Sequence, residues 1–331
     1  MTHTEDTYLV CRAFDTDPRC RSRAALLARG LEAVVAGLRH AALTTGAAKG
    51  CLCVDAGDPD RAASIGVAVG QAGLGMDISV VPVEPAPVLE DDSALLRVLE
   101  GRQAIPHVIV PPAAPPTLWG RPAVVLDLED LARPAPAAPV TLMVTVWTGG
   151  QPLVTEVLET ATVREVLRDA AGGAAESGHV AGAGCGADGG HAARFGSTLG
   201  RFLAGPGLDT PLGPATPWRP PVLQIVPPGV CGVGAVRDAL REVSAASCGA
   251  CVVCREGTRQ LADMLAEVAE SRAGVEVPGL MRELADALDA GSICGLGVAA
   301  ADVLRTGLEV FAADFSAHLD GAPCREGGAG A

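Results

Sequence analysis

Three cysteines, Cys248, Cys251 and Cys254, follow one another with two intervening residues each in the stretch SCGACVVCREGT. This spacing puts three thiols on one tight loop, close enough to bind a single metal centre. A cube of iron and sulfide needs a fourth thiolate, which can come from anywhere in the fold. Cys294, in the later stretch SICGLG, is the candidate fourth ligand. The four cysteines predict a 4Fe–4S cluster.

Other interpretations of these cysteines stay open. Zinc also takes four thiolates, although its sites usually pair two C-x2-C units or include histidine, and no histidine lies between Cys248 and Cys294. A disulfide requires an oxidising compartment. Inert buried thiols are common, but they rarely follow so regular a spacing. We rank the iron–sulfur cluster first, zinc second and inert thiols third.

Helical periodicity surrounds the cysteine motif. Beyond Pro228, apolar residues recur at helical spacing in four stretches, which predicts a four-helix bundle. We expect the cluster at one end of this bundle, where the loop before the second helix meets the loop after the third. The apolar stripes are Val233, Val236, Leu240 and Val243; Leu261, Met264, Leu265 and Val268; Leu280, Leu284 and Leu288; and Leu304, Leu308, Phe311 and Phe315.

The first part of the chain alternates between predicted strands and helices. This alternation predicts a Rossmann-like sheet with helical crossovers. The acidic triplet Glu90, Asp91 and Asp92 is interpreted as the solvated start of a helix rather than as paired catalytic carboxylates. The predicted strands are residues 8–10, 51–55 and 78–83, and the predicted helices are residues 26–43, 61–71 and 93–100.

The middle of the chain predicts a small β-grasp module. Residues 134–139, rich in proline and alanine, read as a linker. Two apolar runs then flank Gly149 and Gly150 as in a hairpin. Thr162 and Glu165 form a capping box at the start of a helix.

Other residues that could do chemistry form weaker patterns. Gly184, Gly186 and Gly189 match G-x-G-x-x-G, but they neither follow a clear strand nor open a clear helix, so loop glycines are the better interpretation. Cys231 and Cys324 are weak candidates for extra metal ligands. The six histidines form no spacing motif, and we predict no catalytic residue.

Composition limits the classes of function. The chain has 331 residues, of which 49% are hydrophobic, and a net charge of −14, which makes nucleic acid an unfavourable partner. No apolar run reaches the ~18 residues that a membrane span needs. The acidic start has no apolar signal region. Eleven cysteines, an odd number, favour a reducing cytoplasm.

Several blocks resemble a known family. SCGACVVCREGT and SICGLG resemble the patterns E-S-C-G-x-C-x-P-C-R-E-G-T and I-C-x-L-G of the NADH–quinone oxidoreductase-F family, the NADH- and FMN-binding subunits of complex I. YLVCRAFDTDP resembles that family's Y-L-V-C-N-A-D-E-G-E-P, and GAAKGCLCV resembles its G-A-S-K-G-Y-I-Y-I. Subunits of NAD-reducing hydrogenases and formate dehydrogenases share these patterns. The resemblance implies that Cys248, Cys251, Cys254 and Cys294 ligate a 4Fe–4S cluster.

The departures from the family concern its flavin. The family's glycine-rich G-R-G-G-A-G-F-P loop precedes the Y-L-V-C block, and only seven residues precede Tyr8. Arg12 and Phe14 stand where the family has Asn and Asp, and residues 126–130 replace its N-N-V-E-T. Glu90, Asp127 and Asp130 add carboxylates where a phosphate site needs donors and positive dipole ends. We therefore expect a divergent member without a flavin site.

The predicted fold class is α/β plus α, in the domain order that the resemblance implies. The boundaries are a degenerate Rossmann-like FMN/NADH-type domain at 1–133, the linker at 134–139, the β-grasp module with a Gly/Pro-rich extension at 140–220, a helical 4Fe–4S domain at 221–320 and a flexible tail at 321–331.

The first functional hypothesis is a 4Fe–4S electron-transfer subunit of a cytoplasmic oxidoreductase complex, free or peripheral to a membrane. Its partners by resemblance are a small 2Fe–2S subunit and a larger Fe–S subunit. The second is an NADH dehydrogenase flavoprotein subunit with a divergent or partner-completed FMN site. The third is an assembly subunit with a structural cluster. We expect the isolated chain neither to hold FMN nor to oxidise NADH.

Overall fold

The structure is a computed structural model that describes residues 7–107, 115–133, 139–176, 192–213, 221–227 and 229–322, without the side chains of residues 171–176. The glycine pattern at Gly184, Gly186 and Gly189, most of the predicted linker and Cys324 lie outside the described residues. The chain divides into two compact units, Met1–Val144 with Glu156–Leu158 and Thr145–Thr155 with Glu159–Ala331. The described helices include none that is long and apolar enough to cross a bilayer.

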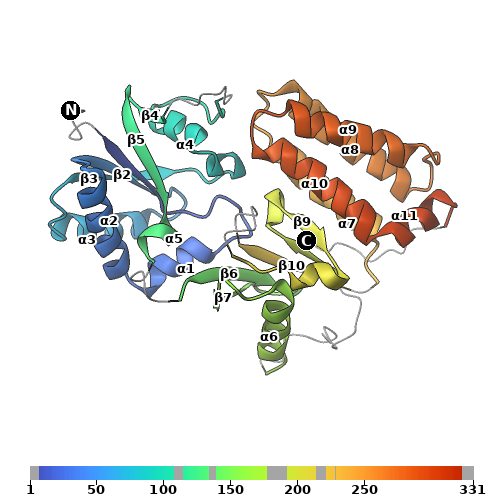
Figure 1. The fold of residues 1–331 in the computed structure, drawn as a ribbon, viewed down its shortest axis with the longest axis horizontal. Coiled ribbons are helices and arrows are strands. Elements are labelled where there is room, and N and C mark those ends of the chain that lie inside the picture. The colour runs from blue at the N-terminus through green and yellow to red at the C-terminus, as the bar shows by residue number, and fades with distance from the viewer. Residues whose placement is uncertain are drawn as a thin grey trace. The chain divides into compact units, whose positions relative to one another are not determined.

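A five-stranded sheet in the order β3-β2-β1-β5-β4 organises the first unit (Figure 1). Four of its strands run parallel, and the short β4 pairs antiparallel to β5. Helices in the connections make the parallel pairing feasible. The strands are β1 (Tyr8–Arg12), β2 (Lys49–Asp55), β3 (Asp77–Val83), β4 (Thr117–Leu118) and β5 (Arg121–Asp127), and the helices are α1 (Ser22–Arg29), α2 (Leu31–Thr45), α3 (Pro59–Gln71), η2 (Pro87–Glu90), α4 (Asp92–Leu99) and α5 (Leu128–Leu131).

The single helix predicted over residues 26–43 is wrong in one respect, because the structure has two helices there. Gly30 separates α1 from α2 with φ of +138°, a conformation that side-chain-bearing residues rarely adopt. Apolar residues of β1, β2, α2, α3 and α5 form one core, which includes Leu9, Leu52 and Leu38. The predicted strands at residues 51–55 and 78–83 agree with β2 and β3.

A second five-stranded sheet, in the order β7-β6-β10-β8-β9, mixes parallel and antiparallel pairs. Its elements are β6 (Thr141–Trp147), β7 (Leu153–Leu158), α6 (Val163–Glu176), β8 (Ala192–Phe195), η3 (Ser197–Leu199), β9 (Arg201–Leu203), η4 (Gly205–Asp209) and β10 (Val222–Val226). The predicted capping box is confirmed: Thr162 N–H donates to Glu165 at 2.9 Å, and Glu165 N–H donates to Thr162 Oγ1 at 3.2 Å.

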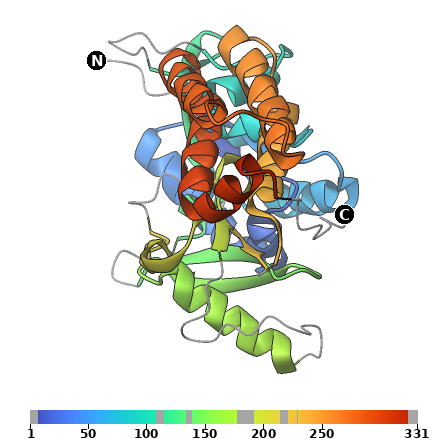
Figure 2. The ribbon, with the colours of Figure 1, turned by 90° about the vertical axis from the view of Figure 1, so that its right-hand side faces the viewer.

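The rest of the described chain is helical, and its helices pack side by side, orange to red in Figures 1 and 2. They are α7 (Gly232–Ala245), α8 (Val252–Ala269), α9 (Val277–Gly291), α10 (Gly295–Val310) and α11 (Ala312–Leu319). The predicted apolar stripes of the first three helices lie on α7, α8 and α9, and Val236, Leu265 and Leu288 are fully buried. The fourth stripe divides between α10 and α11, because the chain turns at Phe311, whose ring packs against Gly232 and Phe202.

Candidate functional site

The four predicted cluster cysteines lie at the starts of two helices. Cys251 is the N-cap of α8, and Cys254 lies in the first turn of that helix. Cys248 belongs to the loop between α7 and α8, and Cys294 is the N-cap of α10. The first N–H groups of a helix lack partners within it, and this end carries the positive dipole charge. Both helix starts therefore favour negatively charged sulfur.

The loop before α8 and the loop between α9 and α10 lie against each other. The thiol of Cys251 donates to the carbonyl oxygen of Gly291 at 3.7 Å. A Cβ atom added to Gly297 would lie 3.6 Å from Cys254 Cβ, and one added to Gly291 would lie 3.3 Å from the Val253 side chain. The tertiary structure thus brings the neighbourhood of Cys294 to the three-cysteine loop.

Local hydrogen bonds hold the three-cysteine loop in shape. Gly249 has φ of +76°, which favours glycine at this position. Its N–H donates to Ser247 Oγ at 3.3 Å, and its carbonyl accepts from the Arg255 guanidinium at 2.7 Å. The loop is therefore stabilised by hydrogen bonds within itself and with the first turn of α8.

The surroundings of Cys254 disfavour a free thiolate at that residue. Burial raises the pKa of Cys254, and the neighbouring Cys251 and Cys248 raise it further, whereas a hydrogen bond with Ser247, 3.7 Å away, lowers it. Clustered thiols of this kind need cations to become thiolates together, and coordination to a metal deprotonates a thiol outright.

The residues present fit a 4Fe–4S cluster by the chemistry of their donors. None of the nine described cysteines forms a disulfide, so the four thiols keep their sulfur available. The described residues hold no group of three or more Cys, His, Asp or Glu side chains gathered tightly enough for one metal ion. Each thiolate of such a cluster binds a different iron, so the four sulfurs need not converge on one point.

A second candidate region lies at the carboxyl edge of the first sheet. β1 has β2 on one side and β5 on the other, so the strand order changes direction here. Open sheets of this kind bind ligands outside the carboxyl ends of their strands at such a switch point. The last residues of the two strands, Arg12 of β1 and Asp127 of β5, are partners in the ladder register.

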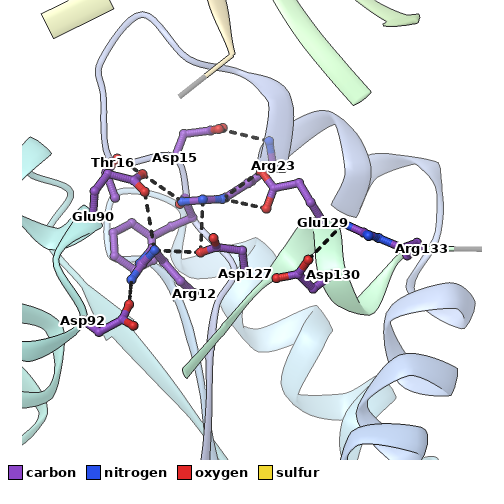
Figure 3. Close-up of polar contacts among 11 residues, drawn as sticks. Arg12, Asp15, Thr16, Arg23, Glu90, Asp92, Asp127, Glu129, Asp130 and Arg133 are labelled. Atoms are coloured by element: carbon purple, nitrogen blue, oxygen red, sulfur yellow. Dashed lines mark hydrogen bonds and ion pairs between the residues drawn. The ribbon is translucent and has the colours of Figure 1, made fainter. Parts of the chain in front are cut away.

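Figure 3 shows that two buried arginines and several carboxylates fill this edge. The Arg12 guanidinium lies 2.7 Å from Asp127, 2.5 Å from Asp92 and 3.4 Å from Glu90. The Arg23 guanidinium, supplied by α1, lies 3.2 Å from Glu90 and 3.2 Å from Asp127. The side chains of Arg12 and Arg23 are only 3% and 4% exposed.

Further hydrogen bonds complete this ion-pair network. Arg23 Nε lies 3.1 Å from both oxygens of Glu129, and Arg23 also donates to the carbonyl of Phe14. Thr16 Oγ1 donates to Glu90. Asp15 accepts from the backbone N–H groups of Arg23 and Ala24 at 3.0 Å each. The loop after β1 and the start of α1 are thereby tied to η2 and α5.

The network favours the charged forms of Glu90 and Arg23, whereas burial raises the pKa of Glu129 against the lowering effect of Arg23. For Glu90, burial would raise the pKa, but Arg23 and Arg12 outweigh it, and the pKa is lowered. For Arg23, burial would lower the pKa, but Glu129, Glu90 and Asp127 outweigh it, and the pKa lies well above its usual value. Burial raises the pKa of the half-exposed Asp92, against the lowering effect of Arg12.

The structure corrects the interpretation of the acidic triplet. Asp91 and Asp92 do begin a helix, and Asp91 caps α4 by accepting from Ala94 N–H. Glu90, however, ends η2 with its side chain only 12% exposed, facing Arg12 and Arg23. Those partners lie far back in the sequence, so no local pattern could reveal them. Arg23 was missed altogether, and Arg12 was recognised only as a departure from the family.

The helical part of the chain is similar to a known protein family. Residues 234–318, which contain all four cysteines, match the family described as the NADH-ubiquinone oxidoreductase-F iron-sulfur binding region. The NADH-quinone oxidoreductase-F protein of Mycobacterium tuberculosis is 26% identical over 285 residues, covering 78% of this chain and 61% of that protein. The chain is thus similar to NADH-quinone oxidoreductase-F proteins, most clearly in this iron-sulfur binding region. It spans about three fifths of the length of these curated relatives.

Other proteins similar to this chain belong to hydrogenases. The NADP-reducing hydrogenase subunit HndC of Solidesulfovibrio fructosivorans is 22% identical, covering 97% of this chain and 70% of that protein. A crystal structure of an NAD+-reducing [NiFe]-hydrogenase in the H2-reduced state matches with a TM-score of 0.80 at 22% identity, over 96% of this chain and 57% of that one. The two chains therefore share a fold.

FMN is the second cofactor that the resemblance implies, and the carboxyl edge does not fit its phosphate. The guanidiniums that could bind a phosphate already bind Glu90, Asp127 and Glu129. A neighbouring cavity, lined in part by Phe14 and Arg61, measures only about 50 Å³, against about 300 to 1,000 Å³ for ordinary ligand sites. The arginines of this edge are thus already paired with carboxylates of the chain itself.

Proposed function

We propose that this chain is a divergent member of the oxidoreductase-F family and a 4Fe–4S electron-transfer subunit of an oxidoreductase complex. The observation that carries the proposal is the meeting of the Cys251 and Cys254 loop with the start of α10 at Cys294, inside the region that matches the iron–sulfur family. A bound 4Fe–4S cluster supplies one-electron transfer.

In this proposal, Cys248, Cys251, Cys254 and Cys294 hold the cluster, one thiolate to each iron. The N-termini of α8 and α10 stabilise the negative charge of the thiolates. Buried Cys254 anchors the site to the helical core, of which it is a member. Val252, 60% exposed between Cys251 and Cys254, leaves the other side of the loop open to solvent or to a partner.

We further propose the following division of labour. Residues 1–133 form a Rossmann-like scaffold without its own flavin, and residues 140–220, with strands β6 to β9 and α6, form the β-grasp module. The 134–139 linker joins these two parts, residues 221–320 form the cluster bundle, and residues 321–331 form the tail. The partners are a small 2Fe–2S subunit and a larger Fe–S subunit, in the reducing cytoplasm that the thiols require.

Metal and sulfide analysis of anaerobically purified protein tests the proposal. We expect about four irons and four sulfides per chain, and one reversible one-electron couple in a redox titration followed by EPR. Replacing Cys248, Cys251, Cys254 or Cys294 by alanine removes a ligand, so the cluster should be lost or converted.

Cys20→Ala is the matched control, because Cys20 is a buried thiol of the first unit outside the cysteine motif. It should keep the full iron content. Stoichiometric zinc without iron in the anaerobic protein would contradict the cluster, as would an unchanged iron content in the Cys254→Ala variant.

A further inference from the structure

A sulfur–imidazole pair lies at the end of α7 away from the cluster loop. Cys231 is the N-cap of α7, whose 14 residues separate it by about 21 Å from the loop that holds Cys248. Cys231 Sγ lies 3.2 Å from Nε2 of His318 on α11. Both residues are buried, with 7% and 4% exposure. Neither belongs to the site described above.

A third residue determines which nitrogen of the His318 ring carries the hydrogen. Ser271, in the loop between α8 and α9, donates its hydroxyl hydrogen to the carbonyl of Ala322 at 2.9 Å. Towards His318 Nδ1, 3.5 Å away, the hydroxyl can therefore only accept. Nδ1 then carries the ring hydrogen, and Nε2 presents its lone pair to the thiol of Cys231. His318 is thus oriented as the acceptor of the thiol proton.

The surroundings also suit the sulfur once its proton has moved. The N–H of Gly234 donates to Cys231 Sγ at 3.5 Å, so the start of α7 stabilises negative charge on the sulfur. The protonated Nε2 would donate from the other side. Asp314 is engaged separately, accepting from Gly232 N–H at 2.7 Å. Ser271 has φ of +53°, a strained conformation for a residue other than glycine.

The remaining described thiols outside the cluster motif lack such a setting. Burial raises the pKa values of Cys11, Cys20, Cys51 and Cys53, in the last case to about 12. Cys231 is also more exposed than any of these four. Thiolate character and access decide which cysteine an oxidant attacks.

We propose that Cys231, with His318 as base and Ser271 as its positioning residue, is a peroxide-reactive thiol. The thiol proton moves to His318 Nε2, and the sulfur attacks one oxygen of a hydroperoxide. The S–O bond forms as the O–O bond breaks, and His318 returns the proton to the leaving oxygen. With hydrogen peroxide, the products are a sulfenic acid and water. Sulfur loses two electrons and the peroxide gains two.

Oxidation would alter the contact that joins the start of α7 to α11, because the S–H donor to His318 is consumed. The site therefore couples an oxidant to the packing of the last described helix. No part of this reaction uses the four cluster cysteines.

To test this proposal, the full chain is purified anaerobically and treated with hydrogen peroxide and dimedone, a reagent that traps sulfenic acids. Peptide mass spectrometry then measures the labelling of each cysteine. We expect Cys231 to be labelled faster than the internal controls Cys20 and Cys51. His318→Gln should slow labelling of Cys231 by about a hundredfold or more, because a general base is lost. Cys231→Ser should abolish labelling of that peptide and leave the iron content unchanged.

Ser271→Gly guards against misfolding, because glycine accepts the backbone conformation while the hydroxyl is removed. It should slow labelling severalfold. If Ser271 had only a structural role, the variant should instead be labelled faster, because loosened packing would expose the Cys231 thiol. Labelling of Cys231 no faster than that of Cys20 and Cys51, or a rate unchanged or raised in both the His318→Gln and Ser271→Gly variants, would overturn the proposal.

Discussion

At the scale of single residues, the buried arginines at the carboxyl edge of the first sheet carry the largest network of ion pairs described above. Arg23 faces Glu90, Asp127 and Glu129 with a side chain that is 4% exposed. Desolvating such charges is costly, and only close partners offset the cost. The network therefore contributes to the free energy of unfolding mainly through the penalty for breaking it, since removing one partner leaves a buried charge alone.

Arg23→Ala should destabilise the first unit by about 3 to 5 kcal/mol, because it removes the cation that faces Glu129. Urea unfolding, read from hydrogen exchange in the β1 and β5 peptides, measures the change. The matched control is Arg133→Ala, which breaks a half-exposed pair with Asp130 at 3.2 Å and should cost less than about 1 kcal/mol. Equal losses in the two variants would show that burial does not govern the network.

At the scale of elements, α7 and α10 approach closely because Gly307 has no side chain. A Cβ atom there would lie 2.4 Å from Val236 Cγ2, closer than packed atoms can come. Thr306, the preceding residue of α10, accepts from Phe202 N–H of β9 at 3.1 Å. α10 is therefore held between α7 and the second sheet, and its position also sets where Cys294 lies.

Gly307→Ala should cost about 1 to 3 kcal/mol in stability of the helical region, because α7 and α10 must move apart. Gly279→Ala is the control within the same region, since a Cβ at that position of α9 meets nothing within 4 Å. Alanine should be neutral or up to about 1 kcal/mol stabilising there. Thermal unfolding of both variants separates packing from helix propensity, and a stabilised Gly307→Ala would contradict the close contact.

At the scale of the whole molecule, the two candidate cofactor sites differ in whether their side chains are available to bind a cofactor. The cysteine loops present donors that fit a cluster, whereas the carboxyl edge of the first sheet is filled by its own side chains. The fold of this part alone does not imply that it binds a nucleotide. We therefore expect one redox centre in the chain, carried by the helical region.

The purified chain should neither bind FMN nor oxidise NADH, because Arg12 and Arg23 are already neutralised by carboxylates. Reconstitution with excess FMN, followed by equilibrium dialysis and an NADH–ferricyanide assay, measures both. Cys254→Ala serves as control, since it removes a proposed cluster ligand and leaves the carboxyl edge intact. Tight FMN binding with turnover in the intact protein would instead support the flavoprotein hypothesis.

The sequence by itself determined the features that depend on spacing and local pattern. The C-x2-C-x2-C motif, the parallel strands β2 and β3, and the capping box of Thr162 and Glu165 follow from neighbouring residues, whose chemistry acts over one turn or one strand. The sequence did not predict the break at Gly30 or the turn at Phe311, because the apolar periodicity continues across both.

Tertiary structure decided what depends on residues far apart in the chain. By sequence Glu90 resembles a solvated helix start and Cys231 is only a weak candidate metal ligand, until folding brings Arg12 and Arg23 to Glu90 and places His318 of α11 beside Cys231. Desolvation and Coulomb interactions act between such distant residues only once the chain has folded. For that reason the sequence predicted which residues could bind a cluster, whereas only the structure showed how the carboxyl edge is filled.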